Sequence, residues 1–392
     1  MRKGWEYKKL GEIGKIVTGS TPSTKDESNY TPREYCFVKP SDLPSQGIGD
    51  IEETEYYVSK VGLSKSRVLP AGSVLVSCIG SIGKIGILTK EACSNQQINA
   101  IIPQGVIDSR FIAYSLYAQR FVLESIANAP VVPIINKTDF SKIRIGIPPQ
   151  STQLTIVSEL DKINELIRLK KEQLKDFDNL AQSLFYEMFG DPVENEMGWE
   201  VHLLKTLCTK IGSGATPKGG SKSYKKEGTS LIRSLNIHNN EFKFKDLAYI
   251  DDDQADSLNN VIVQENDVLL NITGASVARC CIVPTEVLPA RVNQHVCILR
   301  HGNLIDAKYI NRLLTNGNYQ QLLQRLAKSK AATREALPKS IVDKLSIPLP
   351  PLPLQRLFAQ RIEQIEREKS EVQKSIQDLE TLLASRMQYW FE

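Results

Sequence analysis

Residues 156–188, "IVSELDKINELIRLKKEQLKDFDNLAQSLFYEM", place apolar side chains at alternating intervals of four and three residues. Only Lys170 interrupts this pattern, and the stretch contains no Pro or Gly. Such spacing over several heptads is typical of a long helix whose apolar face packs against a second helix in a coiled coil. The expected seam positions are Ile156, Leu160, Ile163, Ile167, Leu174 and Phe177.

The same spacing returns in the segment that follows residue 352, interrupted only at Lys369 and Arg386. Two long helices with matching seams are expected to pair with each other. The alternative is that each helix packs only on its own domain, but the regular heptads favour the pair. The seam positions of the second helix are Phe358, Ile362, Ile365, Val372, Ile376 and Leu379.

Most of the remaining sequence also occurs twice. The offset between the copies drifts by a few residues, as expected when small loop insertions separate two copies of one fold. The repeated segments are "VTGSTPS" (17–23) with "GSGATPK" (212–218), "SCIGSIGKIGIL" (77–88) with "NITGASVARCCIV" (271–283), "NQQINAII" (95–102) with "NQHVCILR" (293–300), and "KIRIGIPPQSTQ" (142–153) with "KLSIPLPPLPLQ" (344–355).

Each copy begins with a region rich in Gly, Pro and short β-branched runs such as "GSVLVSCIG" and "NDVLLNITG". These runs predict short strands joined by loops, with a few helices such as 108–126 and 306–327. The predicted fold class is therefore α+β. The expected boundaries are 1–150 for the first domain, 151–190 for the first long helix, 191–352 for the second domain and 353–392 for the second long helix.

The linker after the first helix limits the arrangement. The helix ends at "GDP" (190–192), and the second domain has resumed by Trp199. The linking residues reach roughly 28 Å at most, whereas the helix is roughly 58 Å long. The sequence therefore predicts a dumbbell. Two mixed α/β domains, related by a pseudo-twofold axis, are separated by an antiparallel coiled coil of the two long helices.

Composition and charge narrow the class of partner. The formal net charge is +4, and the long-helix segments hold more acidic than basic residues, so the basic excess lies in the two domains. That distribution is compatible with a polyanionic partner. The seven cysteines form no CxxC pair, and no apolar run reaches the roughly 18 residues of a membrane span. We therefore expect a cytoplasmic protein with no membrane contact.

Catalytic motifs are missing from the sequence. It has no GxxxxGK[ST] phosphate loop, no strand-borne GxGxxG, no HExxH zinc motif and no GxSxG nucleophile motif. The four histidines also lack cysteine partners at zinc-ligand spacing. We therefore expect a binding protein without a metal or cofactor of its own. An enzyme with an unrecognised site is the alternative, and it would show turnover without a partner.

Two duplicated motifs carry a resemblance to a known family. A Trp followed by a Gly-Ser/Ala-Thr-Pro loop opens each copy, at 5–22 and 199–217. A Pro-Pro-x-x-x-Gln junction leads into each long helix, at 148–153 and 350–355. With these motifs in the order domain, helix, domain, helix, the whole chain resembles the specificity (S) subunit of type I restriction–modification systems.

The resemblance implies that the two globular domains are target recognition domains. Each would read one half-site of a bipartite double-stranded DNA target. The long helices would separate the domains and dock two methyltransferase (M) subunits, which restriction/translocase (R) subunits join in the full complex. Adenine methylation or restriction would be directed to the target, with AdoMet, ATP and Mg²⁺ on the partner subunits and no catalytic residue on this chain.

Residues that recur in both domains cannot distinguish two different half-sites, so they are expected to serve the fold or the DNA backbone. The repeated loop either supplies amides and a hydroxyl to phosphate or only turns the chain. For the paired cations we favour phosphate contact over solvated charge, and for Asn95-Gln96 and Asn293-Gln294 a structural hydrogen-bond role. The loop candidates are Gly19, Ser20, Thr21, Gly214 and Thr216, and the cations are Lys39, Lys84, Arg233 and Arg279.

Base specificity is expected where the copies differ. The divergent regions are 23–47 against 218–241 and 125–140 against 326–342. The second copy carries clustered basic residues in both regions. Its DNA-binding candidates there are Lys218, Lys222, Tyr224, Lys225, Lys328, Lys330 and Arg334.

Two alternatives to a subunit of a full restriction system stay open. One is an orphan specificity subunit that serves a methyltransferase without a nuclease, which a neighbouring nuclease gene would exclude. The other is a coiled-coil scaffold with two modules that bind protein or carbohydrate, although only 7% of residues are aromatic. DNA affinity falls steeply with salt concentration, which separates DNA binding from the scaffold.

Overall fold

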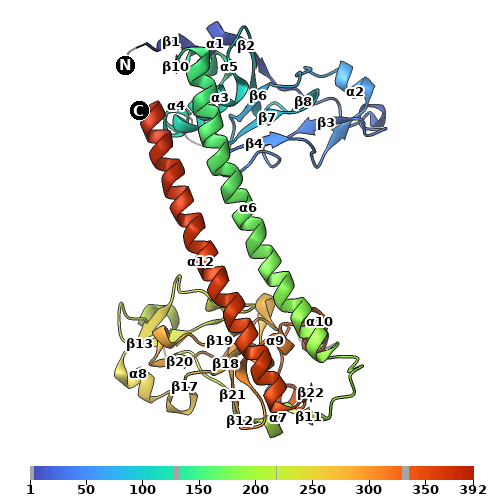
Figure 1. Cartoon of the computed structure of the whole chain (residues 1–392), viewed down its shortest axis with the longest axis vertical. Coiled ribbons are helices and arrows are strands. Elements are labelled where there is room, and N and C mark those ends of the chain that lie inside the picture. The colour runs from blue at the N-terminus through green and yellow to red at the C-terminus, as the bar shows by residue number, and fades with distance from the viewer. Residues whose placement is uncertain (1–3, 128–132, 218, 329–334) are drawn as a thin grey trace. The chain divides into compact units, whose positions relative to one another are not determined.

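The computed structural model describes residues 4–127, 133–217, 219–328 and 335–392. The chain divides into unit 1, residues up to 171 with 374–392, and unit 2, residues 172–373. Each unit holds one globular domain and a segment of each long helix, α6 (Gln150–Phe189) and α12 (Leu352–Phe391) (Figure 1). Domain 1 is the part of unit 1 before α6, and domain 2 is the part of unit 2 between α6 and α12.

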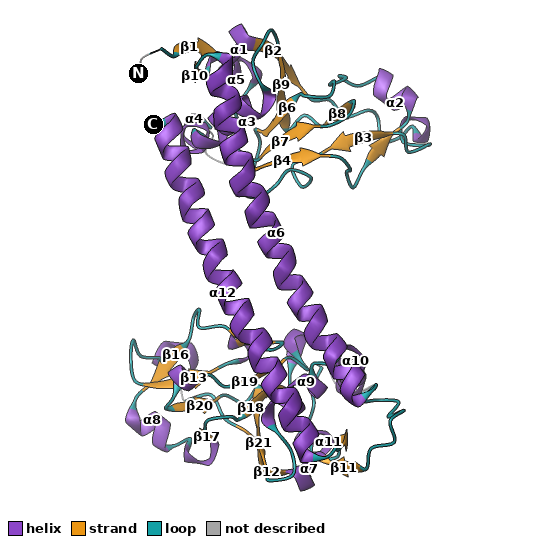
Figure 2. Cartoon of the chain, viewed as in Figure 1, coloured by secondary structure: helices purple, strands orange, loops and turns teal. Residues whose placement is uncertain are grey.

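Three small sheets form domain 1 (Figure 2). Their strand orders are β2-β9-β6-β7-β4, β5-β3-β8 and β1-β10. Neighbouring strands are antiparallel except for β4 with β7 and β3 with β8. The strands are β1 (Glu6–Lys9), β2 (Gly14–Thr18), β3 (Tyr35–Val38), β4 (Ile48–Ile51), β5 (Tyr57–Val58), β6 (Val74–Ser77), β7 (Ile85–Leu88), β8 (Ala92–Ser94), β9 (Ile98–Pro103) and β10 (Arg144–Ile147).

Strand β6 lies at the centre of domain 1 and is buried on both faces. Because side chains alternate along a strand, Val74 and Val76 enter one apolar cluster and Leu75 enters another. Helix residues such as Ile112 complete the first cluster. The helices of domain 1 are α1 (Leu10–Ile13), α2 (Lys60–Ser64), α3 (Ser109–Ala118), α4 (Arg120–Ile126) and α5 (Lys137–Lys142), with a 3-10 turn η1 (Glu27–Asn29).

Domain 2 is built on four small sheets. Their strand orders are β12-β21-β18-β19, β16-β13-β20-β17, β14-β15 and β11-β22. All pairs are antiparallel except β13 with β20. The strands are β11 (Val201–Leu203), β12 (Cys208–Ser213), β13 (Thr229–Ile232), β14 (Ile237–His238), β15 (Glu241–Phe242), β16 (Ala248–Ile250), β17 (Ile262–Val263), β18 (Val268–Asn271), β19 (Cys280–Ile282), β20 (Ala290–Val292), β21 (Val296–His301) and β22 (Ser346–Pro348).

Short helices and 3-10 turns connect these strands. Within the described part of the chain, no helix carries an apolar stretch long enough to cross a membrane. The helices of domain 2 are α7 (Leu204–Leu207), α8 (Asp252–Asp256), α9 (Ala307–Leu314), α10 (Gly317–Ala327) and α11 (Lys339–Val342). The 3-10 turns are η2 (Gly220–Ser223), η3 (Ser234–Asn236), η4 (Asn259–Val261), η5 (Gly274–Ser276) and η6 (Thr285–Val287).

The two domains repeat one topology. The central order β2-β9-β6-β7 of domain 1 corresponds to β12-β21-β18-β19, and β5-β3-β8 corresponds to β16-β13-β20. In domain 2, Val268 and Leu270 of β18 face one core cluster and Leu269 faces another, as in β6. Domain 1 adds β4 at one sheet edge, and domain 2 adds β17 at another. The predicted pair of mixed α/β domains is confirmed.

The helices predicted at 108–126 and 306–327 are each broken in two, so the prediction of continuous helices was wrong. Helix α3 ends before Gln119, whose backbone departs from helical geometry, and α4 follows it. Helix α10 has its own N-cap, because the Asn316 side chain accepts a hydrogen bond from the Asn318 amide at 3.0 Å. An Asn at this position competes with helix continuation by offering the backbone a local partner.

In unit 1, the start of α6 and the end of α12 run antiparallel. The Glu159 carboxylate accepts hydrogen bonds from Trp390 Nε1 at 2.9 Å and from Arg386 Nη2 at 3.1 Å. One end of the paired segment is marked by Lys171 Nζ, which lies 2.9 Å from Glu380 Oε1. The residue numbers of the contacting partners decrease along α12 as they increase along α6, as expected of antiparallel helices. The seam residues Ile156, Leu160, Ile163, Ile167 and Ile376 are buried, and Leu379 is half-buried.

In unit 2, the end of α6 and the start of α12 are also antiparallel. Lys369 forms an ion pair with Asp178. Further along, the Phe358 ring lies 5.7 Å from the Phe185 ring and 5.1 Å from the Phe189 ring, measured between centroids. The seam residues Phe358, Ile362, Ile365 and Val372 are buried, and Leu174 and Phe177 are half-buried. The predicted antiparallel pairing of the long helices is confirmed within each unit.

A buried glutamine joins each long helix to its domain. Gln153 donates to Pro148 O at 3.0 Å, and its Oε1 accepts from the Asp108 amide at 3.1 Å. Gln355 repeats this, with Pro350 O at 2.7 Å and the Asp306 amide at 2.9 Å. Both Asp side chains cap the helix that follows them, α3 or α9. The repeated Pro-Pro-x-x-x-Gln motif thus fixes how a long helix leaves its domain.

The helix seam gives a first test. We expect Ile365→Asp to lower the free energy of unfolding by roughly 3 kcal/mol or more, because it buries a carboxylate without a partner. Chemical denaturation of the purified chain measures this change. The matched control is Gln364→Asp, at an exposed neighbouring position of α12, which should change stability by about 0.5 kcal/mol. Equal effects of the two variants would show that Ile365 does not pack in a seam.

The junction gives a second test. Gln355→Ala leaves the Asp306 amide and the Pro350 carbonyl buried without their partner, so stability should fall by about 1–3 kcal/mol. The control Gln377→Ala removes an exposed glutamine side chain from the same helix. Thermal unfolding of both variants distinguishes the cases. If the Gln355 variant melts with the control, the hydrogen bonds do not hold the junction.

Candidate nucleic-acid interface

The Gly-Ser-Thr-Pro loop of domain 1 packs against the turn that precedes β9. A Cβ atom on Gly19 would lie 2.0 Å from Asn95 O, so only glycine permits this approach of the two backbones. Two residues on, the Thr21 hydroxyl donates a hydrogen bond to Gln96 Oε1 at 2.7 Å. The first repeated loop and the first Asn-Gln pair therefore form one structural feature.

Domain 2 repeats this feature. The Gly214 amide donates to Asn293 O at 3.1 Å, and a Cβ on Gly214 would lie 1.7 Å from Val292 O. The Thr216 hydroxyl donates to Gln294 Oε1, as Thr21 does in domain 1. The sequence repeats the glycine and the threonine together because both are needed to seat the loop on this turn.

Several donors of the repeated loop form hydrogen bonds within the protein. The Gly19 and Ser20 amides donate to Ile98 O and Ser94 O at 2.9 and 2.8 Å. Ser20 Oγ also accepts from the Arg67 amide at 3.2 Å. Each threonine hydroxyl donates its single proton to a glutamine side chain. Of the two roles considered for the loop, these contacts favour turning the chain over binding phosphate.

The asparagines that recur in both domains hold turns. Asn95 Oδ1 accepts a hydrogen bond from the Gln97 amide at 3.1 Å. Asn293 Oδ1 accepts one from the His295 amide at 3.0 Å. A side-chain oxygen that binds the amide two residues on is the usual contact of an Asx turn. These contacts give both asparagines the structural role that their repetition suggests.

The paired cations of domain 1 lie at one junction. Lys39 Nζ is 3.0 Å from the centroid of the Tyr56 ring, a cation–π contact. Lys84 Nζ donates to the carbonyl of Pro40, the residue after Lys39, at 3.2 Å. Both lysines are only half-buried. The fold therefore brings these two candidates together, just before β7 and just after β3.

The paired cations of domain 2 occupy the corresponding junction. The Arg233 guanidinium donates to Asp246 O, and its central carbon lies 5.3 Å from the centroid of the Tyr224 ring. Arg279 lines a cavity together with Ser234, the residue after Arg233. Arg279 thus lies near the residue that follows Arg233, as Lys84 lies near the residue that follows Lys39.

The remaining candidates are spread over domain 2. Lys222 lies exposed on η2, and Lys225 Nζ pairs with Asp251 Oδ2 at 3.1 Å. Tyr224 is half-buried against the core of domain 2. Lys328 Nζ lies 3.8 Å from Glu335 Oε1. The candidates Lys218, Lys330 and Arg334 lie outside the described residues.

A cavity of about 540 Å³ opens beside Arg279. His295 links it to the repeated loop, because its Nδ1 is 2.6 Å from Thr273 Oγ1 and its Nε2 is 3.1 Å from Gln294 Nε2. Donors, acceptors and a cation therefore converge on one open site. The lining residues are Ser234, Leu235, Thr273, Gly274, Ala275, Ser276, Arg279, His295, Glu335 and Ala336.

Sequence reasoning did not single out Thr273, His295 or Glu335 as site residues. Glu335 lies in the divergent region 326–342, where base specificity was expected. The other two lie inside repeated motifs, in which only the residues shared by both copies were considered. The positions at which the two copies differ could have identified them as site residues. Domain 1 has Ile79 and Gln97 where domain 2 has Thr273 and His295.

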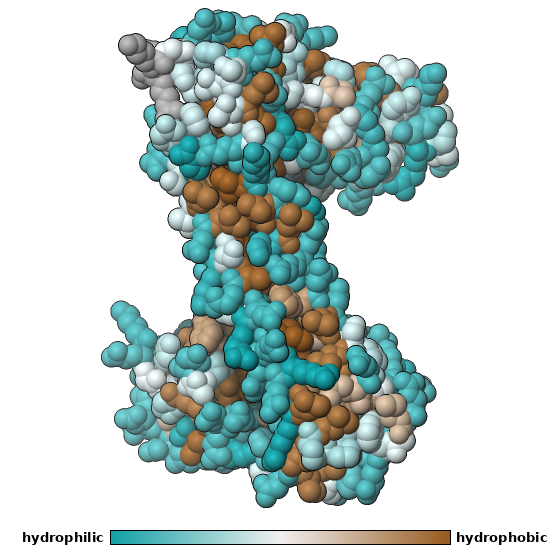
Figure 3. All heavy atoms as spheres, viewed as in Figure 1, coloured by the Kyte–Doolittle hydropathy of each residue, from teal (hydrophilic) through white to brown (hydrophobic). Residues whose placement is uncertain are grey.

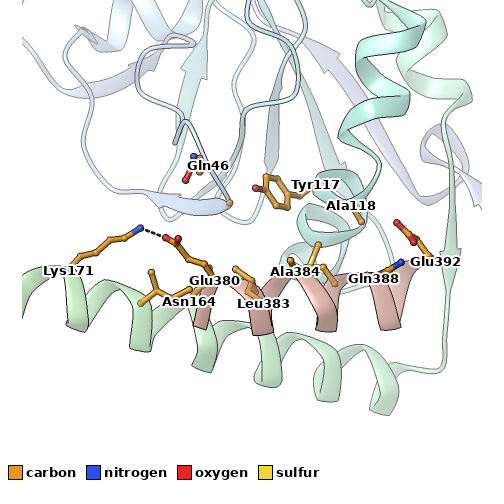
Figure 4. Close-up of a pocket in the computed structure, with 13 residues that line it drawn as sticks. Gln46, Tyr117, Ala118, Asn164, Lys171, Glu380, Leu383, Ala384, Gln388 and Glu392 are labelled. Atoms are coloured by element: carbon orange, nitrogen blue, oxygen red, sulfur yellow. Dashed lines mark hydrogen bonds and ion pairs between the residues drawn. The ribbon is translucent and has the colours of Figure 1, made fainter. Parts of the chain in front are cut away.

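A second hollow, of about 580 Å³, lies in unit 1 where domain 1 meets the two helices (Figure 4). Domain 1 contributes Gln46 and Tyr117, and α12 contributes Leu383 and Ala384. The ion pair between Lys171 and Glu380 closes one end of it. Its lining mixes apolar and polar side chains on two rigid helices, a composition suited to a protein surface rather than to DNA phosphate.

Several thiols in the described part of the chain are buried. Burial raises the pKa of the Cys78, Cys281 and Cys297 thiols to about 12. A thiol with such a pKa is a poor nucleophile at neutral pH. Among the described residues, no group of three or more His, Cys, Asp or Glu side chains could hold a metal ion. The chemistry that these residues offer is hydrogen bonding and charge.

Comparison with known proteins agrees with this chemistry. The model of the type I restriction modification DNA specificity domain matches residues 2–176 and, a second time, residues 196–381. Over 383 residues, the chain is 24% identical to the specificity subunit of the type I restriction enzyme MjaIX from Methanocaldococcus jannaschii. That alignment covers 91% of this chain and 85% of the relative.

Solved structures show the same fold. A chain from a structure of a type I restriction–modification system, concerned with complex assembly and conformational transition, has a TM-score of 0.61 at 18% identity and covers 100% of this chain and 98% of its own. The S subunit from M. genitalium has a TM-score of 0.57 at 12% identity, over 98% and 95% of the two chains. Since the family model matches most of the sequence, twice, the chain belongs to the type I restriction–modification DNA specificity family and is a specificity subunit, a non-catalytic component of such a system.

Proposed function

We propose that each domain reads one half-site of a bipartite double-stranded DNA target. The observation that supports this most is the pairing of a shared framework with different surface residues. Both domains seat the same loop on the same turn and bring two cations to the same junction. Two readers of one design would approach DNA in the same way and still recognise different bases.

In this proposal, the cations bind the DNA backbone. Lys39 and Arg233 each lie against a tyrosine ring, which orients a long side chain without neutralising its charge. Lys84 donates to the carbonyl of Pro40, the residue after Lys39, and Arg279 lines a cavity with Ser234, the residue after Arg233. Positive groups at equivalent places on the two domains suit phosphates, whose geometry is the same in every sequence.

We also propose that the long helices dock methyltransferase subunits. Their outer faces carry exposed leucines that the seam does not use, and Figure 3 shows hydrophobic surface on these helices. In unit 1, Leu154 of α6 and Leu382 of α12 line one groove between the helices. Exposed apolar patches of this kind mark protein interfaces. The exposed leucines are Leu154, Leu166, Leu169, Leu180, Leu357 and Leu382.

Two helix surfaces of similar design suit two methyltransferase (M) subunits per chain. Restriction/translocase (R) subunits would join in the full complex and direct cleavage, while the M subunits direct adenine methylation. AdoMet, ATP and Mg²⁺ would then be bound by these partners rather than by this chain. The assembly would act on chromosomal DNA in the cytoplasm.

Domain exchange tests the two-reader proposal. We expect replacement of residues 197–345 by the corresponding domain of another specificity subunit to change one half-site and leave the other unchanged. Sequencing of methylated bases in a host that carries the methyltransferase subunits gives the motif before and after exchange. A host that lacks this gene is the control and should lose the motif. A change in both half-sites would contradict independent reading.

Salt dependence tests the phosphate contacts. We expect Arg233→Ala to weaken binding to all DNA sequences alike and to reduce the slope of log affinity against log salt by about 1. Lys205→Ala removes an exposed lysine from α7, beside the sheet that carries the junction, and serves as the matched control. Binding titrations of the complex with M subunits at several salt concentrations measure both. An altered target motif in the Arg233 variant would assign this arginine to a base instead.

A further inference from the structure

The cavity beside Arg279 has an exact backbone counterpart in domain 1. The Gly80 amide donates to Pro133 O at 3.2 Å, and the Gly274 amide donates to Glu335 O at 2.9 Å. Both glycines have positive φ, 76° and 74°. The fold therefore places Glu335 at the position that Pro133 occupies in the other domain.

A bridge beside each glycine extends the correspondence. In domain 1, Ile79 pairs with Ile134, and in domain 2, Thr273 pairs with Ala336. On the opposite side, the Asx turns place Gln97 and His295 at equivalent positions. The backbone of this site is therefore the same in both domains, and side chains can be compared position by position.

The side chains at these positions differ in kind. Domain 1 presents an apolar surface, with Ile79 half-buried, Ile134 exposed and Pro133 beside them. Domain 2 presents Thr273 and Glu335 in place of Ile79 and Pro133. The glycine and the Asx-turn asparagine beside them recur in both domains. This is the pattern expected of positions that select different bases on a common frame.

Glu335 is the most informative of these residues. A carboxylate at a DNA-binding surface is repelled by phosphates, so it weakens binding to DNA in general. Its contact with Lys328 at 3.8 Å joins two exposed side chains and is weak enough for a ligand to displace. Arg279 lines the same cavity and offsets the repulsion locally. A carboxylate accepts hydrogen bonds only, and at a base edge it suits the amino group of cytosine.

We propose that this cavity of domain 2 reads one base pair of its half-site and that Glu335 accepts a hydrogen bond from the N4 amino group of a cytosine. The inference rests on the proposed function, because it assigns a ligand to the surface that faces DNA there. In domain 1, the corresponding apolar surface of Ile79 and Ile134 suits the methyl group of a thymine. The two half-sites then differ because one reader offers an acceptor and the other offers a hydrocarbon.

The test uses the complex of this chain with its methyltransferase subunits. The methylated motif is determined first, and domain exchange assigns each half-site to a domain. We expect a G·C pair in the half-site of domain 2. Glu335→Gln should then lower the discrimination for cytosine at that one position roughly five- to hundred-fold and favour adenine, which a glutamine amide can bind through two hydrogen bonds. The half-site of domain 1 should not change.

Two further variants keep the result interpretable. Glu335→Asp retains the acceptor and should keep the preference for cytosine. Glu265→Gln removes an exposed carboxylate from another loop of domain 2 and should leave the motif unchanged. Uniform loss of binding to all sequences with Glu335→Gln, an unchanged motif, or a domain 2 half-site without a G·C pair would each overturn the inference. Absence of any bipartite motif in the wild type would instead reject the proposed function.

Discussion

Each domain packs a buried apolar cluster against both long helices. In unit 2, Phe185 of α6 and Phe358 of α12 pack in one cluster with Tyr309, whose ring stacks on Phe185 at 5.9 Å. In unit 1, Ile156 of α6 and Met387 of α12 enter the cluster around Phe111. Because residues of both helices are buried in these clusters, the helix pair contributes to the stability of each domain. A substitution that disrupts the seam should therefore also lower the stability of the domain.

The junction glutamines connect the long helices to the helices that pack on the central sheets. Each one binds the amide of an Asp that caps a helix packed on the central sheet, so the direction of the long helix and the position of that helix are fixed together. Ion pairs add to the connection, as in Arg110 with Asp161 and Arg312 with Glu366. The surface that carries the paired cations is thereby tied to the helices through rigid elements rather than through a loop.

The sequence was informative where the physics is local or periodic. The heptads located both long helices, and the repeat located the loop, the turns and the junction glutamines. The breaks at Gln119 and Asn316 were missed because a cap can end a helix inside an apolar pattern that looks continuous. The cavity beside Arg279 was missed because its lining comes from four distant segments. The hydrogen bonds of the threonine hydroxyls to glutamine were not predicted, because the partners are far apart in sequence.

The hydrogen bonds within the repeated loop explain how one backbone framework can serve two DNA targets. If the repeated loop gave its amides and hydroxyls to DNA, every change of target would risk a change of framework. Here three of the loop amides and both threonine hydroxyls form hydrogen bonds within the protein, and these contacts hold the loop in both domains although neighbouring side chains differ. Positions such as Ile79 and Thr273 lie beside that frame on corresponding backbones and are free to differ in polarity. Stability and recognition then depend on different residues. The recognised sequence can therefore change without loss of the fold.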